Sequence, residues 1–134
     1  IQKDIGNILN ASSVYETAAW GKEDQPAFLN QALLIETNLK AEDLMNTLLQ
    51  IEKNMGRIRQ EHLGPRTIDL DIIFFNDQII DSANLTIPHP QMQKRNFVLT
   101  PLKEIAPNFI HPILKKSITQ LLTDCEDPLL CIKK

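Results

Sequence analysis

The chain lacks several features that identify common classes of protein. It has no GxxxxGK[ST] motif, so it is not a P-loop protein, and it has no glycine-rich loop of the kinase type. No apolar run approaches ~18 residues, so we expect no membrane span. Acidic residues outnumber basic ones, 17 to 14, and the net charge of −3 argues against nonspecific binding to nucleic acid.

Cysteine is also scarce. Cys125 and Cys131 are the two cysteines, and their spacing matches neither a CxxC motif nor a zinc site. We therefore expect two reduced thiols and a cytoplasmic protein. The first residues, IQKDIGN, do not form a signal peptide and do not include Met, so we expect the natural start to be absent from this chain.

The 134 residues suit one domain with a real hydrophobic core, and we predict a single domain over 1–134 that is incomplete at its N-terminus. The residue patterns predict a helix end at 1–7, strands at 8–17, 28–39 and 67–75, a helix at 41–56, a short β-pair at 78–81 and 85–87, a helical stretch at 92–106 interrupted by Pro101, and a helix at 118–125. With one more strand in front, this order gives a ferredoxin-like α/β sandwich with an antiparallel sheet, in the α+β class.

Two acids interrupt the strand predicted at 67–75. Asp69 and Asp71 are two residues apart in the stretch LGPRTIDLDIIFFND, so on a strand they share one face, roughly 6–7 Å apart. Ile68, Leu70 and Ile72 share the other face, which we expect to be the core face. A hard cation such as Mg²⁺ would balance the carboxylates, and a sheet face open to water would also tolerate them, so both interpretations stay open on these residues alone.

Basic residues lie on both sides of the acid pair. Arg57, Arg59 and Arg66 precede it, and Lys94 and Arg95 follow it. Guanidinium groups match phosphate oxygens, and acids with arginines are typical of a phosphoryl-transfer site. A solvated basic loop that pairs with nearby glutamates is the alternative on spacing alone.

Four stretches together resemble a known family. GPRTIDLDIIFF, SSVYETAAWG, DQPAFLNQAL and IPHPQMQKRNFVLTPLKEIAP are similar, in order and spacing, to the signatures of 6-hydroxymethyl-7,8-dihydropterin pyrophosphokinases. The resemblance implies an enzyme of folate biosynthesis that transfers pyrophosphate from ATP to the hydroxymethyl group of the pterin and leaves AMP. It also implies that the first strand and a G-S-N-L-G turn are missing from this chain.

The resemblance assigns roles to residues by motif position. It implies two Mg²⁺ ions held by Asp69 and Asp71, with catalytic roles for these acids and for Arg57 and Arg66. The residues implied to bind ATP are Glu52, Arg57, Arg59, Arg66, Ile72, Thr86, His89 and Arg95.

The pterin is implied to stack between the aromatic rings of Phe28 and Phe97. An amide and a loop are implied to read its polar edge, namely Asn30 and the stretch Thr17, Ala18, Ala19 and Trp20. Rings and an amide suit a flat heterocycle with several donors and acceptors, although for either ring alone ordinary core packing remains an alternative. The expected partners are therefore ATP and the hydroxymethyl-dihydropterin, with neither nucleic acid nor membrane.

Two other function classes remain as alternatives. A noncatalytic ferredoxin-like binding module has no reason to keep the acids opposite the arginines, and a two-metal nuclease needs a third or fourth carboxylate near the acid pair. We expect a monomer, or a swapped dimer if the missing strand destabilises the fold. His62 and His111 are expected to lie at the surface.

Overall fold

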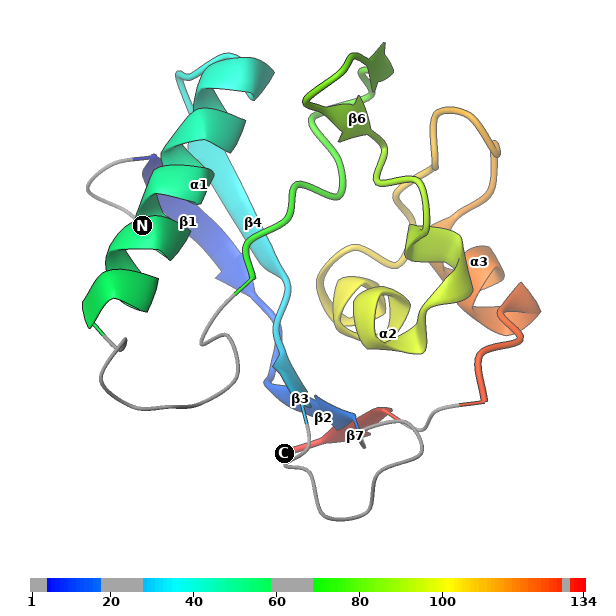
Figure 1. Cartoon of the computed structure of the whole chain (residues 1–134). Coiled ribbons are helices and arrows are strands. Elements are labelled where there is room, and N and C mark those ends of the chain that lie inside the picture. The colour runs from blue at the N-terminus through cyan, green and yellow to red at the C-terminus, as the bar shows by residue number, and fades with distance from the viewer. Residues whose placement is uncertain (1–4, 18–27, 59–68, 129–130) are drawn as a thin grey trace.

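The computed structural model describes residues 5–17, 28–58, 69–128 and 131–134, and in these ranges helices are combined with antiparallel β-pairs (Figure 1). The predicted α+β class is confirmed. The helices are α1 (Ala41–Ile58), α2 (Asn96–Ile105) and α3 (Ile118–Asp124), with a 3₁₀ turn, η1 (Met92–Lys94), before α2. The strands are β1 (Gly6–Ala11), β2 (Tyr15–Thr17), β3 (Phe28–Asn30), β4 (Leu33–Thr37), β5 (Ile80–Asp81), β6 (Thr86–Ile87) and β7 (Cys131–Lys133).

A bent β-ribbon forms one side of the molecule. Strand β1 pairs with β4, and β2 pairs with β3 on one edge and with β7 on the other. The bend lies at Ser12, whose N–H donates to the Ala32 carbonyl at 2.9 Å and whose Oγ accepts from the Ala32 N–H at 2.9 Å. Each of the two long predicted strands is divided here into two shorter ones, and the Ser12–Ala32 bonds hold the chain together across the break.

The predicted helix end near the N-terminus is wrong where the structure describes it. Gly6 begins β1 opposite Thr37. Its φ of +155° favours glycine, and a Cβ there would collide with the carbonyl of Glu36. Gly6 therefore allows the two strands to approach closely instead of ending a helix.

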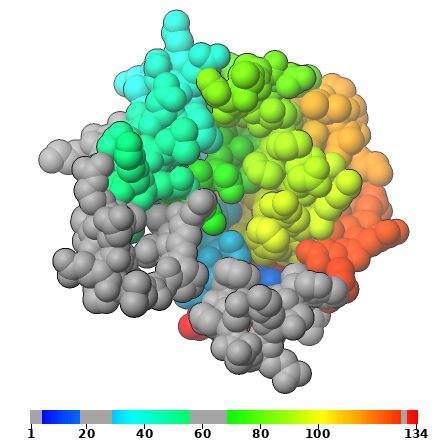
Figure 2. Space-filling model, viewed as in Figure 1, coloured from blue at the N-terminus to red at the C-terminus, as the bar shows by residue number. Residues whose placement is uncertain are grey.

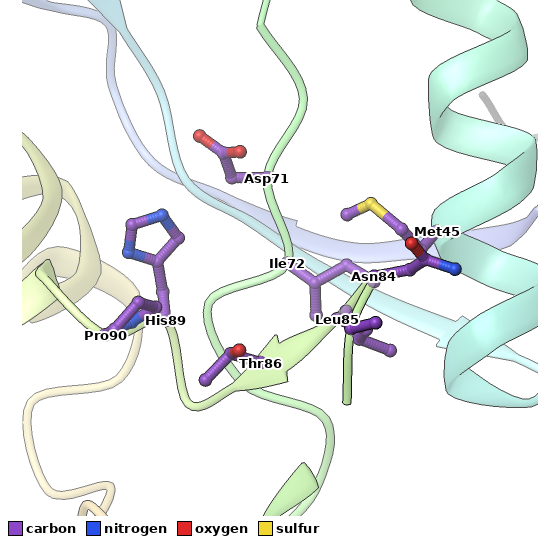
Figure 3. Close-up of a pocket in the computed structure, with 9 residues that line it drawn as sticks. Met45, Asp71, Ile72, Asn84, Leu85, Thr86, His89 and Pro90 are labelled. Carbon is purple, nitrogen blue, oxygen red and sulfur yellow. The ribbon is translucent and has the colours of Figure 1, made fainter. Parts of the chain in front are cut away.

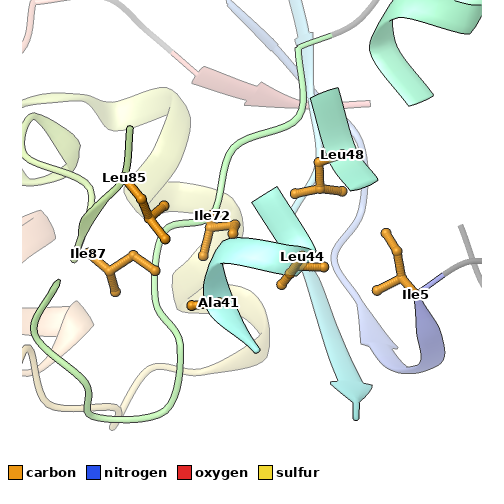
Figure 4. Close-up of a cluster of buried hydrophobic side chains, with 7 residues drawn as sticks. All are labelled: Ile5, Ala41, Leu44, Leu48, Ile72, Leu85 and Ile87. Carbon is orange, nitrogen blue, oxygen red and sulfur yellow. The ribbon is translucent and has the colours of Figure 1, made fainter. Parts of the chain in front are cut away.

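Helix α1 covers the β1–β4 pair and builds the first hydrophobic cluster (Figures 1 and 4). Leu44 and Leu48 are buried as predicted, whereas Leu49 on the same predicted stripe is 52% exposed. Glu42 and Asp43 in the first turn suit the helix dipole. Neither α1 nor another helix in the described ranges is long and apolar enough to cross a membrane. The buried members of this cluster are Ile5, Ala41, Leu44, Leu48, Ile72, Leu85 and Ile87.

Helices α2 and α3 surround a second cluster, formed by Met92, Leu99, Ile118 and Leu121. The predicted interruption at Pro101 is wrong, because this residue lies buried inside α2. His111 is also not at the surface as expected. It is 4% exposed, and its ring meets the edge of Phe74, with 5.6 Å between the ring centroids.

The segment 69–75 joins the two clusters. Ile72 is buried in the first cluster, and Ile73 and Phe74 pack against the second. Figure 2 shows its green atoms set back between the surfaces of α1 and α2. The segment is extended, but the strand predicted here is not found in its described part, since residues 69–75 have no β-ladder partner there.

Candidate functional site

The acid pair lies on the exposed side of the segment 69–75. Asp69 and Asp71 are exposed, whereas Leu70 and Ile72 pack into the first cluster, as the alternation predicted. Ile68 lies outside the described residues. The Leu70 N–H donates to the Glu52 carboxylate of α1, so Glu52 lies beside the acid pair.

The carbonyl of Ile73 on the same segment accepts a hydrogen bond from the His89 N–H at 3.0 Å. A side chain of α1 and the residue after Pro88 thus occupy backbone groups that a β-ladder would otherwise use. These two bonds hold the segment between α1 and the stretch 88–90.

A pocket of ≈ 260 Å³ opens beside Asp71 (Figure 3). Four of its lining residues are ones that the motifs assigned to ATP or metal: Asp71, Ile72, Thr86 and His89. Asp71 and His89 lie on the same side of the pocket, and Met45 and Asn84 lie on the other (Figure 3). Asp71 comes from one piece of chain, and Thr86 and His89 come from another, so their meeting is a property of the fold.

The sequence analysis did not find the rest of the pocket wall. Asn84 and Leu85 belong to the turn between β5 and β6, where Ser82 and Leu85 exchange backbone hydrogen bonds of 2.9 and 3.4 Å. The predicted β-pair could have placed this turn near Thr86. Nothing in the local sequence indicates that the turn also lies close to α1. The lining residues missed are Met45, Ala83, Asn84, Leu85 and Pro90.

His89 is suited to contact an anion as a neutral donor. Burial lowers the pKa of His89 below its usual value, while the Asp71 carboxylate opposes this shift and the Arg95 guanidinium adds to it. The His89 Nδ1 accepts from the Gln91 N–H at 3.3 Å, which leaves the proton of the neutral ring on Nε2. The ring can therefore donate one hydrogen bond to a phosphate oxygen.

Arg95 connects the two predicted halves of the site. It immediately precedes α2, and its guanidinium carbon lies 5.6 Å from the centroid of the Phe97 ring. This distance is within the range of a cation–π contact. A residue assigned to ATP and a ring assigned to the pterin are thus neighbours in space.

Three of the other residues assigned to the pterin, Thr17, Phe28 and Asn30, lie on the sheet β3-β2-β7. Thr17 is paired with Phe28, and Asn30 with Tyr15, across β2 and β3, and α2 lies against both strands. Thr17 is 3% exposed, and its Oγ1 has no hydrogen-bond partner among the residues that the structure describes. A buried hydroxyl without a partner is costly, which is consistent with a ligand or another group completing this position.

Several predicted residues cannot be placed. Arg57 lies in the last turn of α1, and Phe28 begins β3, but the side chains of both are outside what the structure describes. The remaining predicted residues, Ala18, Ala19, Trp20, Arg59 and Arg66, belong to ranges that it does not describe.

The acid pair has the donor chemistry for Mg²⁺. Within the described ranges, no group of three or more His, Cys, Asp or Glu side chains could hold a metal ion. Mg²⁺ usually takes only one or two carboxylates and keeps water and substrate phosphates in its shell, so exposed Asp69 and Asp71 beside an open pocket fit it. A nuclease site with three or four clustered carboxylates is not found in this part of the chain.

Comparisons with known proteins agree with the motifs. The sequence profile of the 7,8-dihydro-6-hydroxymethylpterin-pyrophosphokinase family matches residues 1–107. The 2-amino-4-hydroxy-6-hydroxymethyldihydropteridine pyrophosphokinase of Synechocystis sp. is 49% identical over 120 residues, which cover 88% of this chain and 61% of that protein. The protein of the same name from Aquifex aeolicus is 41% identical over 128 residues, covering 95% of this chain and 80% of its own.

A third relative is much longer. The folic acid synthesis protein FOL1 of Dictyostelium discoideum is 48% identical over 107 residues, which are 80% of this chain but 16% of that protein. The chain thus spans less than two thirds of the Synechocystis relative and a small part of the Dictyostelium one. The family predicted from the motifs is confirmed by these matches.

Proposed function

This chain belongs to the 7,8-dihydro-6-hydroxymethylpterin-pyrophosphokinase family, and from that premise we propose that it transfers pyrophosphate from ATP to 6-hydroxymethyl-7,8-dihydropterin. The products are AMP and the pterin diphosphate, in folate biosynthesis. The observation that carries the proposal is the pocket beside Asp71. Thr86 and His89 reach this pocket from a separate segment, and the charge of Arg95 lowers the pKa of His89.

The phosphates of ATP would lie on the side of the pocket that holds Asp71 and His89. His89 donates through Nε2, and Arg95 adds a positive charge close by. Asp69 and Asp71 would hold two Mg²⁺ ions, which neutralise triphosphate charge when bound. Arg57 and Arg66 are proposed to stabilise the charge that develops on the transferred and leaving phosphates, and Glu52, Arg59, Ile72 and Thr86 are proposed to complete the nucleotide site.

The pterin would lie toward β2, β3 and the start of α2. Phe28 and Phe97 would hold its two faces, and Asn30 would offer a donor and an acceptor to its edge. The hydroxyl of Thr17, without a partner in the described part of the chain, supports a polar contact here. The stretch Ala18, Ala19 and Trp20 is proposed to supply the remaining contacts.

We also propose that the chain forms one ferredoxin-like domain that works as a cytoplasmic monomer. The antiparallel β-ribbon with α1 on one face supports this architecture. Cys125 and Cys131 are free thiols, as proteins of a reducing compartment usually have.

The direct test is to incubate the protein, expressed in full from its gene, with ATP, Mg²⁺ and the hydroxymethyl-dihydropterin, and to separate AMP from ADP. We expect AMP that depends on the pterin. Replacing either acid, in Asp69→Ala or Asp71→Ala, should lower its rate by at least about 100-fold, because each removes a carboxylate that would hold the metal.

Asp77→Ala is the matched control. Asp77 is an exposed acid six residues after Asp71 that does not line the pocket, so the same change of charge there should leave the rate unchanged. A folded protein that forms no AMP, or acid variants as active as this control, would overturn the proposed function.

A further inference from the structure

The first residue of α2 is held by an acid from far along the chain. The Asn96 N–H donates to the Asp127 Oδ2 at 3.0 Å, and the Asn96 Nδ2 donates to the Asp127 carbonyl oxygen at 3.0 Å. Both residues are half-buried. Asp127 thus binds the main chain and the side chain of one residue at the same time.

These bonds replace a cap that the local sequence does not provide. The residue before α2 is Arg95, whose side chain makes no capping hydrogen bond and has no acceptor atom. Helix starts need an acceptor for their first N–H groups and favour a negative charge. Asp127 supplies both from 31 residues away, so the placement of this helix start depends on it.

The residues on either side of Asn96 both belong to the proposed site. Arg95 precedes it and Phe97 follows it, and the guanidinium of one lies over the ring of the other. Arg95 is also close enough to His89 to lower its pKa, so its charge acts on the pocket side. A shift of Asn96 would therefore move a proposed phosphate contact and a proposed pterin ring together.

The segment that carries Asp127 also reaches the pterin side of the site. It follows α3, and a few residues later β7 pairs with β2, where Cys131 lies opposite Thr17. This part of the chain lies beyond residues 1–107, which match the family profile. The contact to Asn96 is thus made by a part of the chain to which the family match assigns nothing.

We propose that Asp127 is a positioning residue for the transfer reaction, which sets the orientation of Arg95 and Phe97 through its two bonds to Asn96. The inference rests on the proposed function. Asp127 itself touches neither substrate, so its loss should weaken the binding of ATP and pterin and slow the reaction without removing any group that contacts them.

The test compares Asp127→Ala and Asp127→Asn with the wild type in the AMP assay, at a temperature where circular dichroism shows each variant to be folded. Asparagine keeps an oxygen that can accept from the Asn96 N–H, whereas alanine does not. We expect kcat/KM to fall about 10- to 100-fold in Asp127→Ala, since small misplacements of binding groups cost this much, and to stay within about threefold of wild type in Asp127→Asn.

Two further measurements separate positioning from general loss of structure. The KM values for ATP and pterin should both rise in Asp127→Ala, and the Kd of a nonhydrolysable ATP analogue should rise with them. Asp124→Asn is the control, because Asp124 is an exposed acid three residues earlier that bonds only to Lys116 and Gln120 in the described contacts. It should leave all three constants unchanged.

Each outcome decides a different statement. If the wild type forms no AMP, the proposed function fails and this inference fails with it. If the wild type is active, and the folded variant Asp127→Ala has the same kcat and KM values as the wild type, the inference alone is overturned. If Asp127→Ala does not fold, Asp127→Glu decides, since it keeps the charge but displaces the carboxylate by one methylene; unchanged KM values in that variant would also overturn the inference.

Discussion

At the scale of single residues, His111 is a buried imidazole with a structural task. Its Nδ1 accepts from the N–H groups of Ile113 and Leu114, at 3.2 and 3.0 Å. Burial lowers the pKa of His111 below its usual value. A protonated ring has no acceptor, so protonation would break both bonds and charge a buried group.

The stability of the protein should therefore fall in mild acid. Below a pH of about 6.5 the unfolded chain binds a proton at this histidine that the folded chain still excludes, so the free energy of unfolding decreases as pH falls, by at most about 1.4 kcal/mol per pH unit. His111→Asn can keep an acceptor near the Nδ1 position but cannot titrate. Urea unfolding between about pH 7 and pH 5 should show a weaker pH dependence in this variant than in the wild type; an equal dependence would contradict the assignment.

At the scale of elements, a carboxylate joins α2 to the β-ribbon. Glu104 on α2 accepts from the Tyr15 hydroxyl at 2.7 Å and from the Ser13 N–H at 2.9 Å. The bond to Glu104, followed by burial, raises the pKa of Tyr15 to about 12. The bonds from Tyr15 and Ser13 hold the pKa of Glu104 below its usual value.

The link should weaken at both ends of the pH range. The raised tyrosine pKa contributes stability that is present below about pH 10 and is lost as pH rises toward 12. The lowered glutamate pKa contributes stability that is present at neutral pH and is lost as the carboxylate is protonated in acid.

The chain has one tyrosine, so the absorbance of tyrosinate reports this link directly. In Glu104→Gln the titration midpoint of Tyr15 should move from near 12 toward 10, with folding checked by circular dichroism at each pH. Glu36→Gln, an exposed acid on β4, should leave the midpoint where it is. A midpoint near 10 in the wild type would show that the bond does not form in solution.

Elements with a strong local pattern were predictable from the sequence, and those that depend on distant partners were not. The apolar spacing of α1 and α3 and the β-pair of β5 and β6 depend on neighbouring residues. The predicted bounds of these elements agree with the observed ones to within a few residues. The segment 69–75 looked like a strand, but its backbone bonds go to Glu52 and His89. Strand β7 was missed because its pairing with β2 is the main reason that it is extended.

The site shows the same division. The motifs singled out Asp71, Thr86 and His89, and the fold brings them to one pocket. Asn84 and Asp127 escaped notice, since a lone Asn or Asp in a polar stretch carries no local signal. Their importance depends on which distant residue they meet.

At the scale of the whole molecule, the pocket lies where the two hydrophobic clusters meet. Met45, Ile72 and Leu85 connect its wall to the first cluster, while Ile73 and Phe74, on the same segment as Asp71, pack against the second. A ligand that fills the pocket contacts residues of the first cluster directly and reaches the second through His89, whose main chain is hydrogen-bonded to Ile73 and Met92. Binding should therefore stabilise the fold as a unit rather than one half of it.

Because the pocket is connected to both clusters, we expect a bound nucleotide to raise the free energy of unfolding, and we expect this gain to depend on the charge of Asp71. A nonhydrolysable ATP analogue with Mg²⁺, at 100 times its Kd, should raise the free energy of unfolding by about 2.7 kcal/mol, and removal of Mg²⁺ with a chelator should abolish most of the gain.

Asp71→Asn should lose the gain, yet without ligand it should be at least as stable as the wild type, because Asp71 is exposed and close to a second acid. Asp77→Asn should keep the gain. Thermal unfolding of the three proteins with and without ligand measures the effect, and an equal gain in Asp71→Asn and the wild type would mean that the nucleotide binds away from this pocket.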